Sequence, residues 1–328
     1  MPRACPVCQA SAFREFATAE TIRLETTLRR RFFEDRAPRR LSRAERKDIT
    51  DFAHDEVAPL LACRCCGLLA RAESETQPLW TYVEDQYDAA ILDELFPRYV
   101  EAFRAKEARY RGLLPPGARV LEIGSHLGAF LQVAGEWGWK AAGVDVGKDT
   151  AEYARLKGHV VYGEAIERCA FGEASFDSVF VWNCFEQIPR PSQTLAEIRR
   201  VLKPGGALVL RTPNGWFYGL CTHFLNNGHN GTRELGLRAL AYNNLLAFPY
   251  LFGYSSLNLG FLVEANGFKF ERGINSQLIT VPLPETPAEV AEEEQTVARS
   301  LQAISRKLLE SHPRILSGPW IELECRKA

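Results

Sequence analysis

Two pairs of cysteines, each with two residues between its members, have the spacing of metal ligands. The pairs are Cys5 with Cys8 and Cys63 with Cys66. A C-x-x-C turn lets two thiolates bind one ion, and two such turns supply the Cys₄ set of a structural zinc site. We therefore expect one Zn²⁺ on these four thiolates, with Cys65 as an alternative to Cys66. A metal-free cluster or a redox pair is the competing interpretation, and residues 9–62 are a long interval for a zinc ribbon.

A second candidate site is a glycine-containing turn that follows a short apolar run. Glu122 precedes Gly124 and Gly128, and the next β-rich run ends in Asp145. Glycine permits a positive φ or the close approach of a ligand, and the following helix begins with free N–H groups. Ligands of open α/β sheets bind in this crevice, beyond the carboxyl ends of the strands. An acid at the end of the next strand is placed for ribose hydroxyls.

A dinucleotide-binding dehydrogenase would also use such a turn, but two features disfavour it. Its G-x-G-x-x-G pattern is broken, because position 126 is His and position 129 is Ala. The carboxylate of Glu122 would also repel a diphosphate, whereas it would attract a cationic amino acid.

The elements that position these residues alternate from Arg119 onward between short β-rich runs and helical patterns. This alternation predicts an α/β fold with a doubly wound sheet. We expect seven strands, at 119–123, 140–145, 159–162, 176–182, 207–211, 268–274 and 320–325. The expected organisation is a small zinc-binding module at 1–70, a helical linker or lid at 71–114 and the sheet domain at 115–328.

Residues 119–214 resemble the class I S-adenosylmethionine-dependent methyltransferases. The matching runs are VLEIGSHLGAFL, GVDVG, YGEAIE, FDSVFVWNCFEQIPRP and LAEIRRVLKPGGALVLRTPN. The resemblance implies the seven-stranded methyltransferase fold, with S-adenosylmethionine as cofactor. The paired-cysteine region ahead of it is similar to the subgroup that contains sugar C-methyltransferases and enzymes of glycan or natural-product pathways.

For the methionine end and the ribose, the resemblance implies four cofactor residues. Glu122 and the backbone at Gly124 and Gly128 would hold the methionine end, and Asp145 would accept from the ribose hydroxyls. The chain departs from the family pattern at His126, where the usual E-x-G-x-G-x-G has its central glycine.

For the adenine and the sulfonium, the resemblance implies five further residues. Val146 would pack on the adenine, and Glu164 with Ala165 would lie near its amino group. Trp182 and Asn183 would border the sulfonium.

The position of a catalytic base is less defined. Many relatives carry L-E-H after the fourth strand, but here Gln187 replaces the histidine, and glutamine cannot act as a general base. Our candidates are His223 first, then Tyr218 and Glu186. A structural histidine, and a helix cap formed by Glu186, are the competing interpretations.

Composition narrows the range of partners. The 328 residues carry a net charge of −1, and no apolar run is long enough to span a membrane. The nine cysteines fit a reducing compartment, so we expect a cytoplasmic protein. Basic residues gather between Arg29 and Lys47, either as a solvated helical face or as a patch for a phosphorylated substrate or RNA.

The expected function is methylation of a small-molecule or saccharide intermediate. The segments expected to form the acceptor wall are residues 80–87 and the insertion 216–254, which is rich in Asn and aromatic residues and poor in Lys and Arg. This composition favours a glycan-like or small polar acceptor and disfavours nucleic acid. An RNA base methyltransferase and an inactive cofactor-binding interaction subunit are the alternatives.

Overall fold

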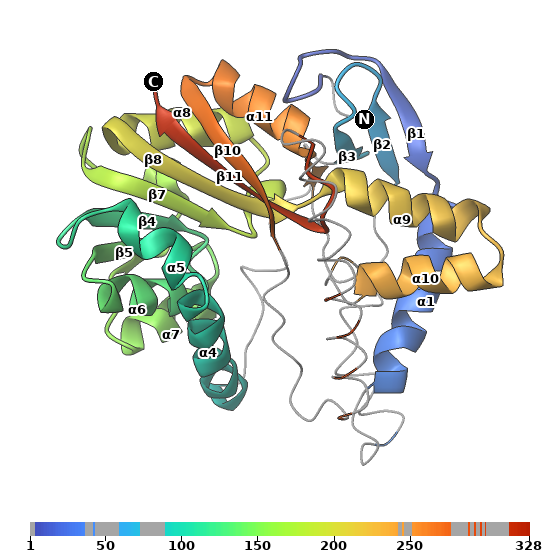
Figure 1. Cartoon of the computed structure of the whole chain (residues 1–328), viewed down its shortest axis with the longest axis horizontal. Helices are drawn as coiled ribbons and strands as arrows, with labels where there is room; N and C mark the ends of the chain where they lie inside the picture. The colour runs from blue at the N-terminus through green and yellow to red at the C-terminus, as the bar shows by residue number, and fades with distance from the viewer. Residues whose placement is uncertain are drawn as a thin grey trace. The chain divides into compact units, whose positions relative to one another are not determined.

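In the computed structural model, the β-rich runs after Arg119 form one seven-stranded sheet (Figure 1). Its strand order is β10-β11-β8-β7-β4-β5-β6, and the neighbours from β8 to β6 are parallel. The strands are β4 (Arg119–Ile123), β5 (Lys140–Val144), β6 (Val161–Tyr162), β7 (Phe176–Trp182), β8 (Leu202–Pro213), β10 (Phe268–Ser276) and β11 (Trp320–Lys327). All seven predicted strands are confirmed. β8 begins before residue 207 because the Lys203–Gly206 segment continues the strand.

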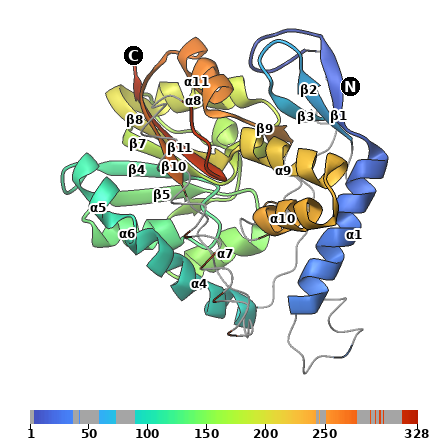
Figure 2. The ribbon, with the colours of Figure 1, turned by 45° about the vertical axis from the view of Figure 1, so that its right-hand side comes forward.

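Helices cover both faces of this sheet, as the doubly wound prediction requires. Figures 1 and 2 show α8 (Pro191–Val201) and α11 (Ser256–Ala265) together on one face, and α4 (Ala89–Arg104), α6 (Ala129–Glu136) and α7 (Lys148–Leu156) together on the other. Leu92 of α4 and Tyr153 of α7 belong to one buried cluster with Leu127. Two short elements, α5 (Glu107–Tyr110) and the 3₁₀ turn η2 (Arg111–Leu113), lead into β4.

The structure describes residues 4–36, 42, 59–72, 89–241, 245, 251–276, 288, 292, 296, 299 and 315–328. The chain divides into two compact units. The sheet unit comprises Gln77–Thr212, Gly260–Arg272 and Glu322–Ala328, and the cysteine unit comprises Met1–Thr76, Pro213–Leu259 and Gly273–Ile321. The expected boundaries near residues 70 and 114 stay predictions, since the cysteine unit also draws on chain far beyond them.

The cysteine unit has a sheet of its own, in the order β1-β2-β3-β9. The strands are β1 (Phe13–Ala17), β2 (Leu60–Cys63), β3 (Leu69–Arg71) and β9 (Phe252–Gly253), and all their pairings are antiparallel. Its helices are α1 (Ala19–Arg36), α9 (Gly215–Asn227) and α10 (Asn230–Ala241). Asn214 caps α9 by accepting from the Trp216 N–H at 3.1 Å, so the T-P-N segment ends β8 and starts this helix.

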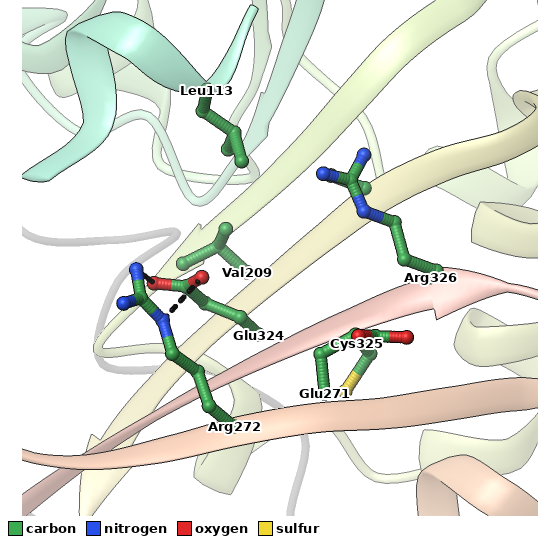
Figure 3. Close-up of a pocket in the computed structure, with 8 residues that line it drawn as sticks. Leu113, Val209, Glu271, Arg272, Glu324, Cys325 and Arg326 are labelled. Carbon is green, nitrogen blue, oxygen red and sulfur yellow. Dashed lines mark hydrogen bonds and ion pairs between the residues drawn. The ribbon is translucent and has the colours of Figure 1, made fainter.

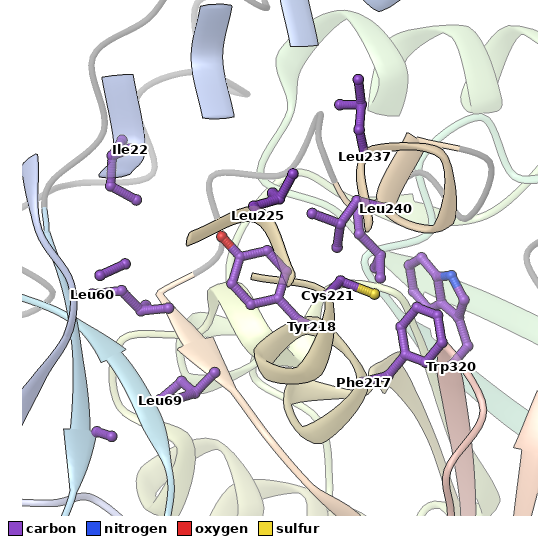
Figure 4. Packing of buried hydrophobic residues seen from close by; sticks show 13 residues of the cluster. Ile22, Leu60, Leu69, Phe217, Tyr218, Cys221, Leu225, Leu237, Leu240 and Trp320 are labelled. Atoms are coloured by element: carbon purple, nitrogen blue, oxygen red, sulfur yellow. The ribbon is translucent and has the colours of Figure 1, made fainter. Parts of the chain in front are cut away.

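The core of the cysteine unit joins segments that are far apart in sequence (Figure 4). Ile22 comes from α1, Leu60 from β2, Leu225 from α9 and Leu240 from α10, and Trp320 closes the cluster with no exposed surface. Burying such side chains contributes roughly 1.5–3 kcal/mol each. Each segment is therefore held by the others rather than by local sequence.

Several predicted segments lie wholly or mostly outside the described residues. They are most of the second half of the basic region between Arg29 and Lys47, the possible acceptor wall at 80–87, and residues 242–244 and 246–250 of the insertion 216–254. Among the helices that the structure describes, none combines the length and apolarity needed to cross a bilayer.

Candidate cofactor site and cysteine cluster

The turn after β4 requires glycine at two positions for steric reasons. Gly124 has a φ of +72°, and a Cβ there would lie 2.6 Å from the Sγ atom of Cys184. Gly128 has a φ of +76°, and a Cβ there would lie 2.7 Å from the ring of His159. Since L-residues rarely adopt positive φ, any other residue at either position would suffer both conformational strain and a steric clash. The turn thus holds α6 close to the ends of the strands.

The acid at the end of β5 organises the same turn. The carboxylate of Asp145 accepts from the His126 N–H at 2.6 Å, the Gly147 N–H at 2.8 Å and the Thr150 hydroxyl at 3.1 Å. The His126 ring packs edge-on against Tyr99, with 5.7 Å between centroids. His126, which replaces the usual central glycine, therefore donates a backbone hydrogen bond to Asp145 and packs its ring against α4.

Glu122 is the buried acid of this site. Its side chain is 2% exposed, and its Oε2 atom has no hydrogen-bond partner among the described residues. Burial, and then the negative charge of Asp145, raise the pKa of Glu122 well above its usual value. A buried carboxyl oxygen without a partner is costly, so this position suits a cationic group on a ligand.

The remaining predicted cofactor residues lie at or shortly after the ends of β5, β6 and β7. Val146 is half-buried, Glu164 is exposed, and Ala165 is half-buried. Trp182 is 4% exposed and its ring stacks on Phe180, so the side chain belongs to the aromatic core of the sheet unit. The roles of all these residues at the cofactor stay predictions.

Asn183 follows directly and has a left-handed backbone with a φ of 58°. Its side-chain Oδ1 atom accepts from the guanidinium of Arg211, and its N–H donates to the Arg211 carbonyl at 2.9 Å. Asparagine tolerates this conformation better than most residues do.

A buried ionic cluster lies behind Asn183, and sequence reasoning missed it. Arg211 and Glu322 are fully buried and form an ion pair, with 3.4 Å between Nε and Oε1. Glu322 also accepts from the ammonium group of Lys106, from the Tyr110 hydroxyl at 2.5 Å and from Arg109 at 3.2 Å. The sequence signal was available, because Arg211 directly follows the apolar run 207–210 and Glu322 lies between Ile321 and Leu323.

The three candidate bases fall in different units. Glu186 lies in the sheet unit, three residues after Asn183, and is completely buried. Burial raises its pKa to about 7, an effect that Thr212, Gln187 and Arg211 partly oppose. The N-cap residue of α8 is Arg190, and Glu186 lies four residues before it, in the 3₁₀ turn Phe185–Gln187.

The other two candidates belong to α9 in the cysteine unit. Tyr218 is buried, and its hydroxyl hydrogen-bonds to the carboxylate of Glu25, 3.1 Å from Oε2. His223 is exposed and contacts the side-chain amide of Asn227 at 3.2 Å. Their catalytic roles stay predictions.

The four predicted zinc ligands lie together. The Sγ atoms of Cys5, Cys8, Cys63 and Cys66 are all within 4.8 Å of one another. Cys5 and Cys66 are 3.5 Å apart, and Cys8 and Cys63 are 3.6 Å apart, close to the ~3.8 Å that Zn–S bonds of ~2.3 Å give in a tetrahedron. Cys65 is exposed and outside the group.

Strand pairing explains how the long interval between the two cysteine pairs is bridged. β1 pairs with β2 so that Phe13 lies opposite Cys63, which returns the chain to its first pair after residues 9–62. Gly67, with a φ of +72°, turns the chain after the second pair, and its N–H donates to the Cys63 carbonyl at 3.1 Å.

One pocket of about 250 Å³ lies in the sheet unit (Figure 3). Val209, Glu324 and Cys325 line it, and Arg272 pairs with Glu324 at 2.8 Å. None of the predicted cofactor residues contributes to its walls.

Comparison with known proteins bears on the sheet unit. The model of a family described as a methyltransferase domain matches residues 89–271, more than half of the chain. The chain belongs to the methyltransferase-domain family. All nine predicted cofactor residues lie within the matched range of this methyltransferase domain, and the resemblance to methyltransferases is confirmed. The sugar C-methyltransferase subgroup stays a prediction.

Curated relatives match the methyltransferase domain over a shorter stretch. The ubiquinone biosynthesis O-methyltransferase of Hahella chejuensis is 36% identical over 106 residues, which is 30% of this chain and 44% of the relative. The protein of the same name from Xanthomonas oryzae pv. oryzae is 32% identical over 105 residues, again 30% of this chain and 44% of the relative. The chain thus spans less than half the length of these relatives.

Solved methyltransferase structures cover more of the chain at lower identity. A SAM-dependent methyltransferase from Archaeoglobus fulgidus is 19% identical and covers 73% of this chain and 100% of its own, with a TM-score of 0.46. A SAM-dependent methyltransferase from Thermotoga maritima, described as a possible histamine N-methyltransferase, is also 19% identical and covers 73% of this chain and 97% of its own, with a TM-score of 0.44.

Proposed function

We propose that this protein transfers a methyl group from S-adenosylmethionine to an oxygen atom of a small molecule. Membership of the methyltransferase-domain family carries the proposal. When bound, S-adenosylmethionine supplies an electrophilic methyl group on a cationic sulfur.

The residues at the ends of β4 and β5 fit this cofactor. Glu122 has a buried carboxyl oxygen without a partner among the described residues, and a cationic ammonium group would offset the cost of its burial. Asp145 already accepts three hydrogen bonds in this structure, so its oxygens are held in place for ribose hydroxyls. Binding would require little rearrangement of the turn.

Glu186 is the base that the sheet unit offers. A hydroxyl nucleophile must lose its proton, and a base works best when its pKa lies near the operating pH. The pKa of Glu186 is raised by burial to about 7, and it follows the end of β7, where the reacting groups are expected. We propose that Glu186 accepts the proton of the acceptor hydroxyl.

Two observations bear on the acceptor: the names of the curated relatives and the composition of the insertion at 216–254. The curated relatives are named O-methyltransferases, which favours oxygen as the nucleophile. Their match spans about 30% of the chain, too little to include the insertion at 216–254 in addition to the strand ends. The composition of that insertion favours a polar, weakly charged acceptor, so a saccharide hydroxyl stays a candidate beside an aromatic one.

The test has two stages. Titration calorimetry with S-adenosylmethionine should give saturable binding, and failure to bind would refute the proposal. Release of S-adenosylhomocysteine should then be measured with catechol, with UDP-glucose and with bulk RNA as acceptor probes. Release of S-adenosylhomocysteine that requires catechol or the sugar supports the proposal. Release with RNA alone would contradict it and favour an RNA methyltransferase.

We also propose that the cysteine unit holds one structural Zn²⁺ on Cys5, Cys8, Cys63 and Cys66. The sulfur spacing carries this proposal. Zinc would cross-link the two turns that the pairing of β1 with β2 brings together, so its binding would be coupled to the folding of this unit. Elemental analysis of purified protein should give about one equivalent of zinc. A folded protein without zinc would contradict the proposed site.

A further inference from the structure

The amide of Asn183 is held in one orientation by the strand beside it. Two contacts join it to Arg211 of β8. Its N–H donates to the Arg211 carbonyl at 2.9 Å, and its Oδ1 accepts from the Arg211 guanidinium. A guanidinium donates and never accepts, so the oxygen of the amide must face Arg211. The Nδ2 group therefore points elsewhere, and it donates to no residue that the structure describes.

Arg211 is itself fixed, so it cannot release Asn183 by turning away. Its side chain is fully buried and forms the ion pair with Glu322 described above. Glu322 is anchored in turn by Lys106 and by the Tyr110 hydroxyl. A buried arginine that lost these partners would be strongly disfavoured. The cluster thus acts as a rigid support behind Asn183.

Asn183 also adjoins the turn that the cofactor would use. The next residue, Cys184, donates its thiol to the Ile123 carbonyl at 3.2 Å. Its sulfur also occupies the space where a side chain at Gly124 would begin. The free amide donor consequently stands at the end of β7 beside the end of β4.

The chemistry of the free donor indicates what it meets. The Nδ2 group of Asn183 can donate but cannot accept, so its partner on a ligand must be an acceptor. At the amino-acid end of S-adenosylmethionine, the acceptor is the α-carboxylate.

We infer that Asn183, positioned by Arg211 and Glu322, donates a hydrogen bond from Nδ2 to the carboxylate of the cofactor. This inference rests on the proposed function. It divides the amino-acid end of the cofactor between Glu122 for the ammonium group and Asn183 for the carboxylate.

The test compares two ligands that share the sulfonium charge, S-adenosylmethionine and its decarboxylated form. Asn183→Gly tolerates the positive φ and removes the donor without adding charge. Its affinity for S-adenosylmethionine should fall by roughly tenfold, the value of one hydrogen bond to a charged group. Its affinity for the decarboxylated form should stay within about twofold of wild type, because no carboxylate is there to lose. Equal losses for both ligands, or no loss, would overturn the inference.

A second variant guards against a purely structural effect. Asn183→Asp keeps an acceptor for Arg211 but has no side-chain N–H to donate, so it should retain the thermal midpoint and still lose affinity for S-adenosylmethionine selectively. Wild-type affinity in this variant would also count against the inference. If wild-type protein binds neither ligand, the proposed function itself fails, which separates the two outcomes.

A double variant tests whether Arg211 affects cofactor binding by positioning Asn183. Arg211→Lys keeps a charge for Glu322 but cannot reach both partners in the same way. It should weaken S-adenosylmethionine binding in the wild-type background and add nothing in Asn183→Gly. Arg272→Lys is the matched control, since it alters an ion pair with Glu324 on the same strand as Glu322. Additive losses in the double variant would show that Arg211 does not act through Asn183.

Discussion

The two units build their candidate sites in opposite ways. In the sheet unit, the predicted cofactor residues lie in one continuous stretch, from Glu122 to Asn183, and each lies at or shortly after the end of a parallel strand. In the cysteine unit, the four thiolates come from two turns that antiparallel pairing of β1 with β2 brings back together. The first site depends on local turns, whereas the second depends on a long-range closure. Substitutions should therefore act locally in one unit and globally in the other.

The largest effect is expected in the cysteine unit. Cys5→Ser should reduce bound zinc from about one equivalent to nearly none and unfold this unit, because metal binding there is coupled to folding. Elemental analysis and limited proteolysis would measure both. Cys65→Ser is the matched control, since Cys65 is exposed and outside the group, and it should keep the metal. Equal zinc loss in both variants would remove the distinction between the two thiols.

A strong but local effect is expected at the turn after β4. Gly124→Ala should lower the free energy of unfolding of the sheet unit by about 2–4 kcal/mol, through positive φ and contact with Cys184. It should leave the zinc content unchanged. Gly112→Ala is the control, because a Cβ there meets nothing within 4 Å. Urea unfolding of both variants decides the matter, and similar midpoints would contradict the geometry.

A smaller effect is expected at the proposed ribose position. Asp145→Ala should weaken S-adenosylmethionine binding by about 1–3 kcal/mol through lost charge-assisted hydrogen bonds. Calorimetry measures the loss, with Glu152→Ala as the control because Glu152 is an exposed acid on α7. If both variants bind equally well, Asp145 has no role in the site.

A comparable effect is expected in the pH dependence of stability. The pKa of Glu186 is raised by burial from 4.5 to about 7, so the folded protein binds more protons than the unfolded chain between these values. The corresponding stability is fully present below pH 4.5 and is lost as the pH rises through about 7.

Glu186→Gln does not titrate and should lose less stability over this range. The difference from wild type should grow by roughly 2.5 kcal/mol between pH 5 and pH 8. Urea titrations at the two pH values measure it, and parallel curves would place the raised pKa elsewhere.

Much of the sheet unit was accessible from sequence because its signals are local. Apolar β-rich runs, terminal glycines and the K-P-G-G segment each indicate their own element, and parallel strand ends meet at one edge whatever the details. The cluster of Arg211, Glu322 and Lys106 was not foreseen. It depends on β11 lying beside β8, a pairing that joins residues more than one hundred positions apart.

The cysteine unit was only partly accessible for the same physical reason. The C-x-x-C spacing predicted which thiolates gather, but nothing local in residues 9–62 indicates that β1 and β2 pair. Tyr218 was chosen as a candidate base from residue type alone. Its hydroxyl instead hydrogen-bonds to Glu25 of α1, a partner that no spacing rule near residue 218 suggests.

The last strand has a consequence for how the chain is made. β11 gives Trp320 and Ile321 to the cysteine unit and its remaining residues to the sheet unit. During synthesis, neither core can close until this strand has left the ribosome, although most of both units has emerged long before. Nascent chains stalled ahead of residue 320 should therefore expose apolar surface from both cores at once, which makes them substrates for chaperones that bind unfolded segments.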